Sequence, residues 1–251
     1  EGGAGHGCGH NLLGTASIEA VVALKQLMTE KKMEGTIRYY GCPAEELLSG
    51  KSYMARAGAF DDLDIVFAWH PGVYNLTVNA SMQALTAIEF FFKGRTAHAV
   101  AAPHLGRSAL DGVELMNVGA NYMREHVPDG TRIQYQITNG GSAPNIVPEK
   151  ASVYYFLRGA SRKAVDELQS RLIKIAEGAA LMTETSVHYE IRSACYDSLP
   201  NMTLNTLMYD QWKEIPPLTY TDEERSFAEQ LSKSIDPSVM AGSKQQLQML
   251  G

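Results

Sequence analysis

Between residues 84 and 192 the spacing of apolar side chains changes repeatedly, and the order of these changes restricts the possible folds more than any other feature of the chain. Four segments rich in β-branched and aromatic residues predict strands, and two segments with apolar residues at helical spacing predict helices. The strands are expected at 84–93, 131–138, 151–158 and 185–192, and the helices at 107–125 and 162–182. This order of strand, helix, strand, strand, helix and strand is that of a ferredoxin-like α+β domain.

The segments on either side of this domain predict an α/β fold. A helix, a strand, a short helix and a second strand are expected before it, at 12–31, 36–41, 51–57 and 63–68. Two further helices are expected after it, at 204–212 and 222–235. Open α/β sheets place their functional residues at the carboxyl ends of strands. We therefore predict an α/β sheet domain formed by residues 1–83 and 196–251, with a ferredoxin-like domain inserted at 84–195.

Composition narrows the class of function. The chain of 251 residues has a formal net charge of −6, which gives no basic surface for nucleic acid. Its three cysteines, Cys8, Cys42 and Cys195, lie far apart in unlike contexts, which argues against a disulfide framework and for a reducing, cytoplasmic compartment. We expect no apolar run of membrane-spanning length. The expected partners are therefore small molecules, without nucleic acid or membrane.

The N-terminal sequence Gly5-His-Gly-Cys-Gly-His-Asn11 is typical of a metal site. His6, Cys8 and His10 fall on alternate residues, and the glycines between them let the backbone bend close to an ion. Two later motifs, each after a predicted strand, add donors of the same kind. They are Cys-Pro-Ala-Glu-Glu at 42–46 and Trp-His-Pro-Gly at 69–72.

Four side chains of these motifs offer thiolate, imidazole and carboxylate ligands, which suit Zn²⁺, or Mn²⁺ if oxygen ligands dominate. They are Cys8, His10, Glu46 and His70. Of the two adjacent carboxylates, one can bind the ion while the other, Glu45, acts as a general base. Four ligands are enough for one ion, and a second ion needs a further ligand from outside this sequence. Taken singly, each motif also has a structural interpretation, as a glycine-rich turn, a solvated acidic turn or a hydrogen-bonded histidine.

Five motifs follow one another along the chain in a recognisable order. They are His6-Gly-Cys-Gly-His10-Asn, Cys42-Pro-Ala-Glu-Glu46, Trp69-His-Pro, Gly94-Arg-Thr-Ala-His98-Ala and Gly140-Gly-Ser-Ala-Pro-Asn145-Ile-Val-Pro. This set resembles the metal-dependent amidohydrolases related to aminoacylase, the auxin-conjugate hydrolases and hippurate hydrolase. Gly106-Arg-Ser-Ala-Leu-Asp111 and Gly178-Ala-Ala-Leu-Met-Thr183 resemble the branch of that family that acts on aminobenzoyl-glutamate. The resemblance spans nearly the whole chain.

The resemblance implies a metal-dependent hydrolase of the amide bond in N-acyl or N-aroyl amino acids, such as aminobenzoyl-glutamate, or in small dipeptides. It makes Cys8 a bridging ligand and Glu45 the general base, with two zinc or manganese ions in the complete protein. The further ligands that it implies are His10, Glu46 and His70.

The resemblance also implies a homodimer formed by the inserted domain. In this family a histidine of that domain, here His98, reaches the neighbouring subunit's site and stabilises the oxyanion. Asn145 is a second substrate contact, and Arg158 binds a substrate carboxylate through two hydrogen bonds. A last histidine ligand comes from near the C-terminal end of the family's catalytic domain, and this sequence has no histidine after His188. We therefore expect a fragment that lacks both ends of its catalytic domain.

Two other functions stay open on the sequence alone. The absent last histidine and the pair Leu47-Leu48, where the family has glycine-rich residues, favour a non-catalytic subunit that dimerises and binds a small ligand. A single structural zinc, closed by four protein ligands, is the third interpretation.

Overall fold

The chain divides into two units in the computed structural model, which describes residues 6–72, 75–239 and 241. The first unit comprises Glu1–Gly41, Asp64–Asn79 and Asn201–Gly251, and the second comprises Cys42–Leu63 and Ala80–Pro200. Each unit is therefore assembled from segments that are distant in the sequence. The domain boundaries expected after residues 83 and 195 remain a prediction.

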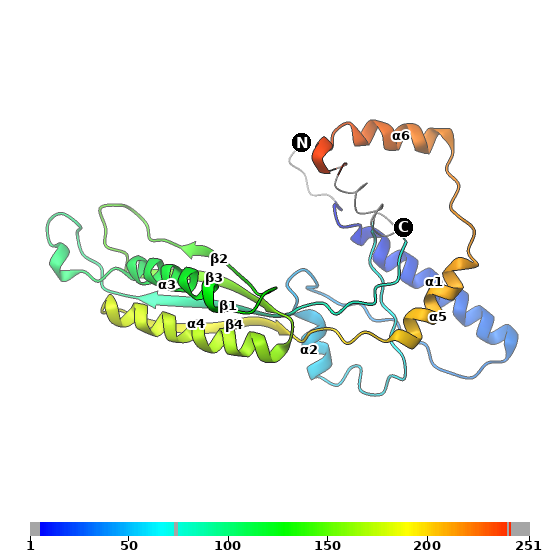
Figure 1. Cartoon of the computed structure of the whole chain (residues 1–251), viewed down its shortest axis with the longest axis horizontal. Helices are drawn as coiled ribbons and strands as arrows, with labels where there is room; N and C mark the ends of the chain where they lie inside the picture. Colours follow the sequence, from blue (N-terminus) through cyan, green and yellow to red (C-terminus); the bar gives the residue numbers. More distant parts are fainter. Residues whose placement is uncertain (1–5, 73–74, 240, 242–251) are drawn as a thin grey trace. The chain divides into compact units, whose positions relative to one another are not determined.

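The second unit contains the ferredoxin-like arrangement (Figure 1). Its sheet has the strand order β2-β3-β1-β4, and all neighbouring strands are antiparallel. Its main elements are β1 (Ala84–Lys93), α3 (Ala109–Met123), β2 (Arg132–Asn139), β3 (Lys150–Gly159), α4 (Arg162–Met182) and β4 (Ser186–Cys195). Three shorter helices also belong to it: α2 (Gly50–Arg56), η1 (Pro103–Leu105) and η2 (Arg124–His126). The predicted order of strands and helices is confirmed.

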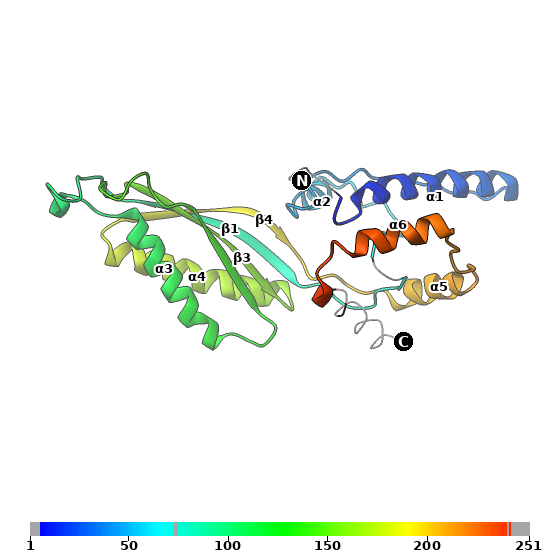
Figure 2. The ribbon, with the colours of Figure 1, turned by 90° about the horizontal axis from the view of Figure 1, so that it is seen from above.

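Helices α3 and α4 cover one face of this sheet (Figure 2). Strands present alternate side chains to opposite faces, and the apolar set of each central strand faces the helices. On β1 this set includes Ile88, Phe90 and Phe92, and on β3 it includes Val153 and Tyr155; all five are buried. The rings of Phe90 and Tyr155 meet edge to face, with 6.0 Å between their centroids. Burial of each large side chain stabilises the domain by roughly 1.5–3 kcal/mol.

Local hydrogen bonds define where these two helices begin. Ser108 caps α3 and Ser161 caps α4, each by accepting a hydrogen bond from the backbone N–H three residues later. Arg162, the first residue of α4, ties the helix to the sheet. Its guanidinium donates to the Leu85 carbonyl at 2.9 Å and to the Thr86 hydroxyl at 2.7 Å.

The first unit is built from helices and irregular segments in the part of the chain that the structure describes. Its helices are α1 (His10–Lys31), α5 (Met202–Lys213) and α6 (Asp222–Ser232), all close to the predicted positions. The strands predicted at 36–41 and 63–68 are wrong, since neither range forms a strand. β-Branched and aromatic residues favour extended backbone, but a strand also needs a partner, and no described segment pairs with either range. The predicted α/β sheet is therefore not observed among the described residues.

Helix α1 exposes apolar side chains along its length. None of its residues is buried, and Leu12, Ile18 and Val22 are each at least half exposed. Contrary to expectation, α1 has the length and mean hydropathy of a minimal membrane span, although Glu19 and Lys25 lie within it. Core helices of soluble proteins and signal sequences can have the same length and mean hydropathy, so these two properties do not show that α1 crosses a membrane.

Candidate functional site

Cys8 lies in the turn that leads into α1, and His10 is the first residue of this helix. The backbone reverses at Gly9, whose φ of 71° lies in the left-handed region that glycine adopts without steric cost. A Cβ atom at residue 9 would come within 2.8 Å of the Pro71 Cβ. The glycine between the two candidate ligands is therefore what allows the segment carrying His70 to pack against this turn.

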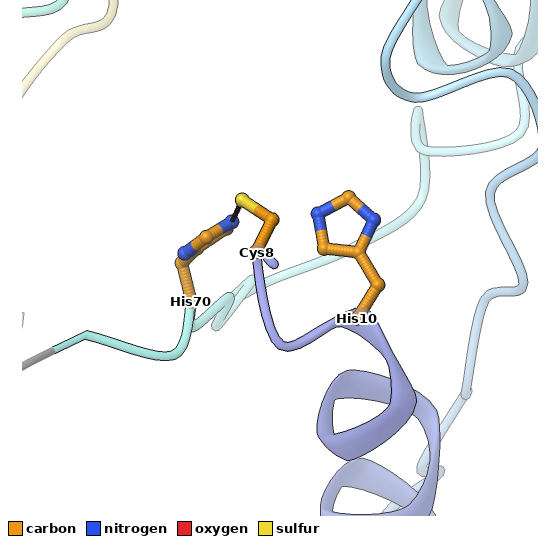
Figure 3. A group of neighbouring side chains, drawn as sticks. All are labelled: Cys8, His10 and His70. Atoms are coloured by element: carbon orange, nitrogen blue, oxygen red, sulfur yellow. Dashed lines mark hydrogen bonds between the residues drawn. The ribbon is translucent and has the colours of Figure 1, made fainter. Parts of the chain in front are cut away.

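The side chains of Cys8, His10 and His70 converge on one point (Figure 3). The Cys8 Sγ and the His70 Nε2 are 3.4 Å apart, and one ligand atom from each of the three residues lies within 4.8 Å of the other two. The two imidazole rings meet at 81° with 5.6 Å between their centroids. Zinc–sulfur bonds of about 2.3 Å and zinc–nitrogen bonds of about 2.0 Å would hold the two donors roughly 3.5 Å apart around a tetrahedral ion. The donor types and their spacing therefore fit zinc, with a fourth position left for another ligand.

His70 is held in the orientation that a metal ligand needs. Its Nδ1 lies 2.7 Å from the Pro71 carbonyl oxygen, which can only accept, so Nδ1 carries the ring proton of the neutral imidazole. Its Nε2, which faces Cys8, then keeps a lone pair for an ion, the usual arrangement of metal-bound histidines. Trp69 Nε1 donates to Ser17 Oγ at 3.0 Å and anchors this segment to α1. The turn at Pro71-Gly72 is the sequence signal for the orientation of His70, whereas the supporting role of Ser17 has no signal in the sequence motifs.

Glu45 and Glu46 are exposed on a tight turn of the second unit. The Leu48 N–H donates to the Glu45 carbonyl at 2.8 Å, and both Ala44 and Leu48 adopt left-handed backbone, with φ of 52° and 53°. This conformation costs a non-glycine residue about 1–2 kcal/mol, so the surrounding contacts hold the turn against local preference. The two carboxylates and the Cys8, His10 and His70 group belong to different units. The roles of Glu46 as a ligand and Glu45 as a base remain predictions.

His98 and Asn145, both predicted substrate contacts, lie on two adjoining loops of the second unit. The antiparallel pairing of β1 with β3 continues beyond the strand ends, where His98 and Ile146 form an isolated bridge. The Ala99 N–H donates to the Asn145 carbonyl at 3.0 Å. The structure therefore brings these two residues together on a hydrogen-bonded pair of loops.

The His98 ring presents a donor to its surroundings. Its Nδ1 accepts hydrogen bonds from the backbone N–H groups of Val100 at 3.2 Å and Ala101 at 3.1 Å. In the neutral ring the proton is therefore on Nε2. Because the side chain is exposed, this N–H is available to an oxygen atom that gains negative charge.

Arg158, the third predicted substrate contact, lies at the opposite end of the sheet. The other end of β3, at Lys150, pairs with Lys93 of β1, next to the loop that carries His98. The strand between residues 150 and 158 spans about 26 Å at roughly 3.3 Å per residue. The structure therefore does not bring Arg158 together with His98 and Asn145 of the same chain.

Comparison with known proteins gives the class of the second unit and the relatives of the chain. Residues 80–184 match the peptidase dimerisation domain. The chain is 45% identical over 236 residues to a p-aminobenzoyl-glutamate hydrolase subunit of Escherichia coli K12, covering 92% of this chain and 48% of that protein. It is 30% identical over 214 residues to the Xaa-Arg dipeptidase of Mus musculus, covering 84% of this chain and 49% of that protein. The crystal structure of an aminobenzoyl-glutamate utilization protein from Klebsiella pneumoniae aligns with a TM-score of 0.55 at 24% identity, covering 66% of this chain and 44% of that one, which supports the fold alone.

The four-stranded sheet with its two covering helices is thus a peptidase dimerisation domain. The chain belongs to the M20 peptidase family, which confirms the resemblance found in the sequence motifs. It spans about half the length of the curated relatives that it matches.

Proposed function

We propose that this chain carries part of the active site of a metal-dependent hydrolase that cleaves the amide bond of N-acyl or N-aroyl amino acids or small dipeptides. The observation that carries the proposal is the convergence of Cys8, His10 and His70, with their ligand atoms within 4.8 Å of one another. The names of the two relatives, an aminobenzoyl-glutamate hydrolase and a dipeptidase, support this substrate class. The proposal includes a cytoplasmic location and an α/β catalytic sheet in the complete protein.

The residues that would hold the metal are Cys8, His10, His70 and Glu46. A bound zinc or manganese ion would polarise the amide carbonyl and make water a better nucleophile at neutral pH. The thiolate, the imidazoles and the carboxylate orient the ion and partly neutralise its charge. A ligand from outside this chain would complete a site for two ions in the whole protein.

Three steps are assigned to the chain's own side chains. The Glu45 carboxylate takes a proton from the attacking water and returns it to the nitrogen of the leaving amine. The His98 Nε2–H donates to the carbonyl oxygen as negative charge develops on it, and Asn145 contacts the substrate from the adjoining loop. The Arg158 guanidinium binds the substrate carboxylate through two parallel hydrogen bonds.

The positions of these substrate contacts support a site shared by two chains. About 26 Å of strand separates Arg158 from the end of the sheet next to His98 and Asn145. A small amide is much shorter than this, so one chain alone cannot contact it at both places. A dimer formed through the dimerisation domain would supply Arg158 from one chain and His98 with Asn145 from its partner.

Glu45→Gln tests the base in the protein at full length. Amide cleavage of aminobenzoyl-glutamate is expected to fall by about 10²–10⁴-fold, the usual contribution of general acid–base catalysis, while metal content stays unchanged. Turnover equal to wild type, with the metal still bound, would remove Glu45 from this role. A metal-loaded wild-type protein that cleaves no N-acyl amino acid or dipeptide would instead favour the non-catalytic subunit.

Mixed dimers test the shared site. A chain with His98→Ala and a chain with Glu45→Gln are each expected to be nearly inactive as homodimers. In the mixed dimer one of the two sites would contain the intact Glu45 of one chain and the intact His98 of the other, so activity should return to about half of the wild-type value per dimer. Mixed dimers as inactive as the two parents would refute the shared site.

A further inference from the structure

A shallow pocket of about 460 Å³ opens in the second unit, beside the base of the loop that carries His98. Its lining comes from the end of β1, from the segment before α3 and from the turn between α4 and β4. The polar lining residues are Lys93, Arg95, Arg107, Glu184, Thr185 and Ser186. None of these residues has a part in the proposed hydrolysis.

The pocket carries an excess of positive charge. Three cationic side chains, Lys93, Arg95 and Arg107, face one carboxylate, Glu184. Lys93 is also the cross-strand partner of Lys150, and like charges directly opposite each other destabilise a sheet. An anion bound at this end of the sheet would relieve the repulsion.

Two of the three cations keep donors that the protein does not use. Arg95 donates from Nε to the Leu105 carbonyl, and its two terminal nitrogens have no acceptor in the described part of the chain. The Lys93 ammonium likewise has no hydrogen-bond or ion-pair partner within residues 6–72 and 75–239. The guanidinium plane and the neighbouring ammonium together match the oxygens of a phosphate or a carboxylate.

The third cation is already fixed and forms a rigid wall. Arg107 Nε is 2.9 Å from a Glu184 carboxylate oxygen, and its Nη1 donates to the His104 carbonyl at 3.2 Å and the Gly106 carbonyl at 2.6 Å. Glu184 has a φ of 51°, a left-handed conformation that is unfavourable for glutamate, at the end of α4. The protein therefore accepts local strain where this carboxylate holds Arg107 in place.

The floor of the pocket is equally well fixed. Backbone hydrogen bonds of 2.8 Å run in both directions between residues 95 and 107. Gly94 approaches so closely that a Cβ atom there would lie 1.9 Å from the Arg107 carbonyl oxygen. Because Arg107 and the backbone floor are already fixed, only the side chains of Lys93 and Arg95 would have to become ordered when an anion binds.

We propose that this pocket is a binding site for a small oxyanion, held by the Lys93 ammonium and the Arg95 guanidinium. Phosphate and a free dicarboxylate share the chemistry that these donors recognise. The site is independent of the proposed hydrolysis, because the substrate carboxylate is assigned to Arg158 at the opposite end of the sheet.

Calorimetric titration of the whole chain with inorganic phosphate tests the site. The titration is run at constant ionic strength with EDTA, so that neither screening nor a metal-bound phosphate produces the signal. Saturable binding is expected, weakened at least tenfold by Lys93→Gln and by Arg95→Gln. Lys174→Gln, which removes a lysine of α4 outside the pocket, is the matched control and should bind as wild type does.

Two further measurements identify the ligand and the role of Arg95. A parallel titration with glutarate distinguishes a dicarboxylate ligand from phosphate, and Arg95→Lys, which keeps the charge but loses the planar donor pair, should recover part of the phosphate affinity. Circular dichroism confirms that each variant is folded. No saturable heat with either anion, or equal affinity in wild type and in folded Arg95→Gln, would overturn the proposal.

Discussion

Gly94→Ala is a sharp test of how tightly the His98 loop is closed at its base. A Cβ atom at residue 94 would lie 1.9 Å from the Arg107 carbonyl oxygen and 3.1 Å from the Ala109 backbone nitrogen. Both neighbours are backbone atoms, so no side-chain rotation can relieve the overlap. The loop must move away from the end of β1.

The magnitude follows from the contacts that this movement breaks. The Arg107 carbonyl accepts from the Arg95 N–H and the Arg95 carbonyl accepts from the Arg107 N–H, each at 2.8 Å. Losing both bonds costs about 2 kcal/mol, at roughly 1 kcal/mol each. Overpacking adds about 1–3 kcal/mol, so the free energy of unfolding should fall by about 3–5 kcal/mol.

Urea unfolding monitored by circular dichroism measures this change, and hydrogen exchange of the Arg95 and Arg107 amides should become faster in the variant. Gly178→Ala is the matched control. A Cβ atom at that position of α4 meets nothing within 4 Å, and alanine should stabilise the helix by up to about 1 kcal/mol. A free energy of unfolding for Gly94→Ala within about 0.5 kcal/mol of wild type, the range of neutral surface changes, would refute the close packing of the loop.

Two further predictions concern titratable groups. Burial, and then repulsion from Tyr135, raise the pKa of Tyr155, so the stability that its neutral hydroxyl gives is complete below about pH 10 and is lost as the pH rises above it. Tyr155→Phe should lower the free energy of unfolding by about 1–3 kcal/mol at neutral pH, because the Asn117 oxygen loses a 2.5 Å hydrogen bond. Between about pH 8 and 11 the urea midpoints of this variant should fall less steeply than those of the wild type. An identical decline would show that Tyr155 is not the group responsible. In α6, hydrogen bonds from the Thr221 backbone and hydroxyl lower the pKa of the Glu224 carboxyl, so this capping box stabilises the helix above the usual glutamate pKa and is lost as the pH falls. Thr221→Ala should reduce helix content at neutral pH and weaken that part of the acid dependence in circular dichroism, because the backbone N–H of residue 221 still donates to Glu224. An unchanged spectrum would count against the cap.

The ferredoxin-like part of the fold could be predicted because its signals are local and agree with one another. The β-branched and aromatic residues of 84–93, which include Phe90 and Phe92, predict a strand there, and the observed β1 has these ends, Ala84–Lys93. The same kind of signal failed at 36–41, where the residues favour a strand but no partner strand is described. The β-propensity of a segment depends on its own residues, whereas a β-strand forms only when a second segment hydrogen-bonds to it.

The candidate site was predictable to a similar extent. The spacing of Cys8 and His10 and the motif around His70 singled out three side chains whose ligand atoms lie together in the structure, and their role as metal ligands stays a prediction. The motifs gave no information on distances across the inserted domain. Arg158 is separated from the loops of His98 and Asn145 by the length of β3. This separation can be recognised only once the pairing of β3 with β1 is known.

The most direct test of the central claim is a titration of the 251-residue chain with Co²⁺, a spectroscopic substitute for zinc, followed by absorption. If Cys8, His10 and His70 hold the ion, a thiolate-to-cobalt charge-transfer band should rise to saturation. The band should vanish in Cys8→Ala and persist in Cys195→Ala, which removes a thiol of β4 outside the group. The same band in Cys8→Ala, or none in the wild-type chain, would contradict the metal site on which the proposed function depends.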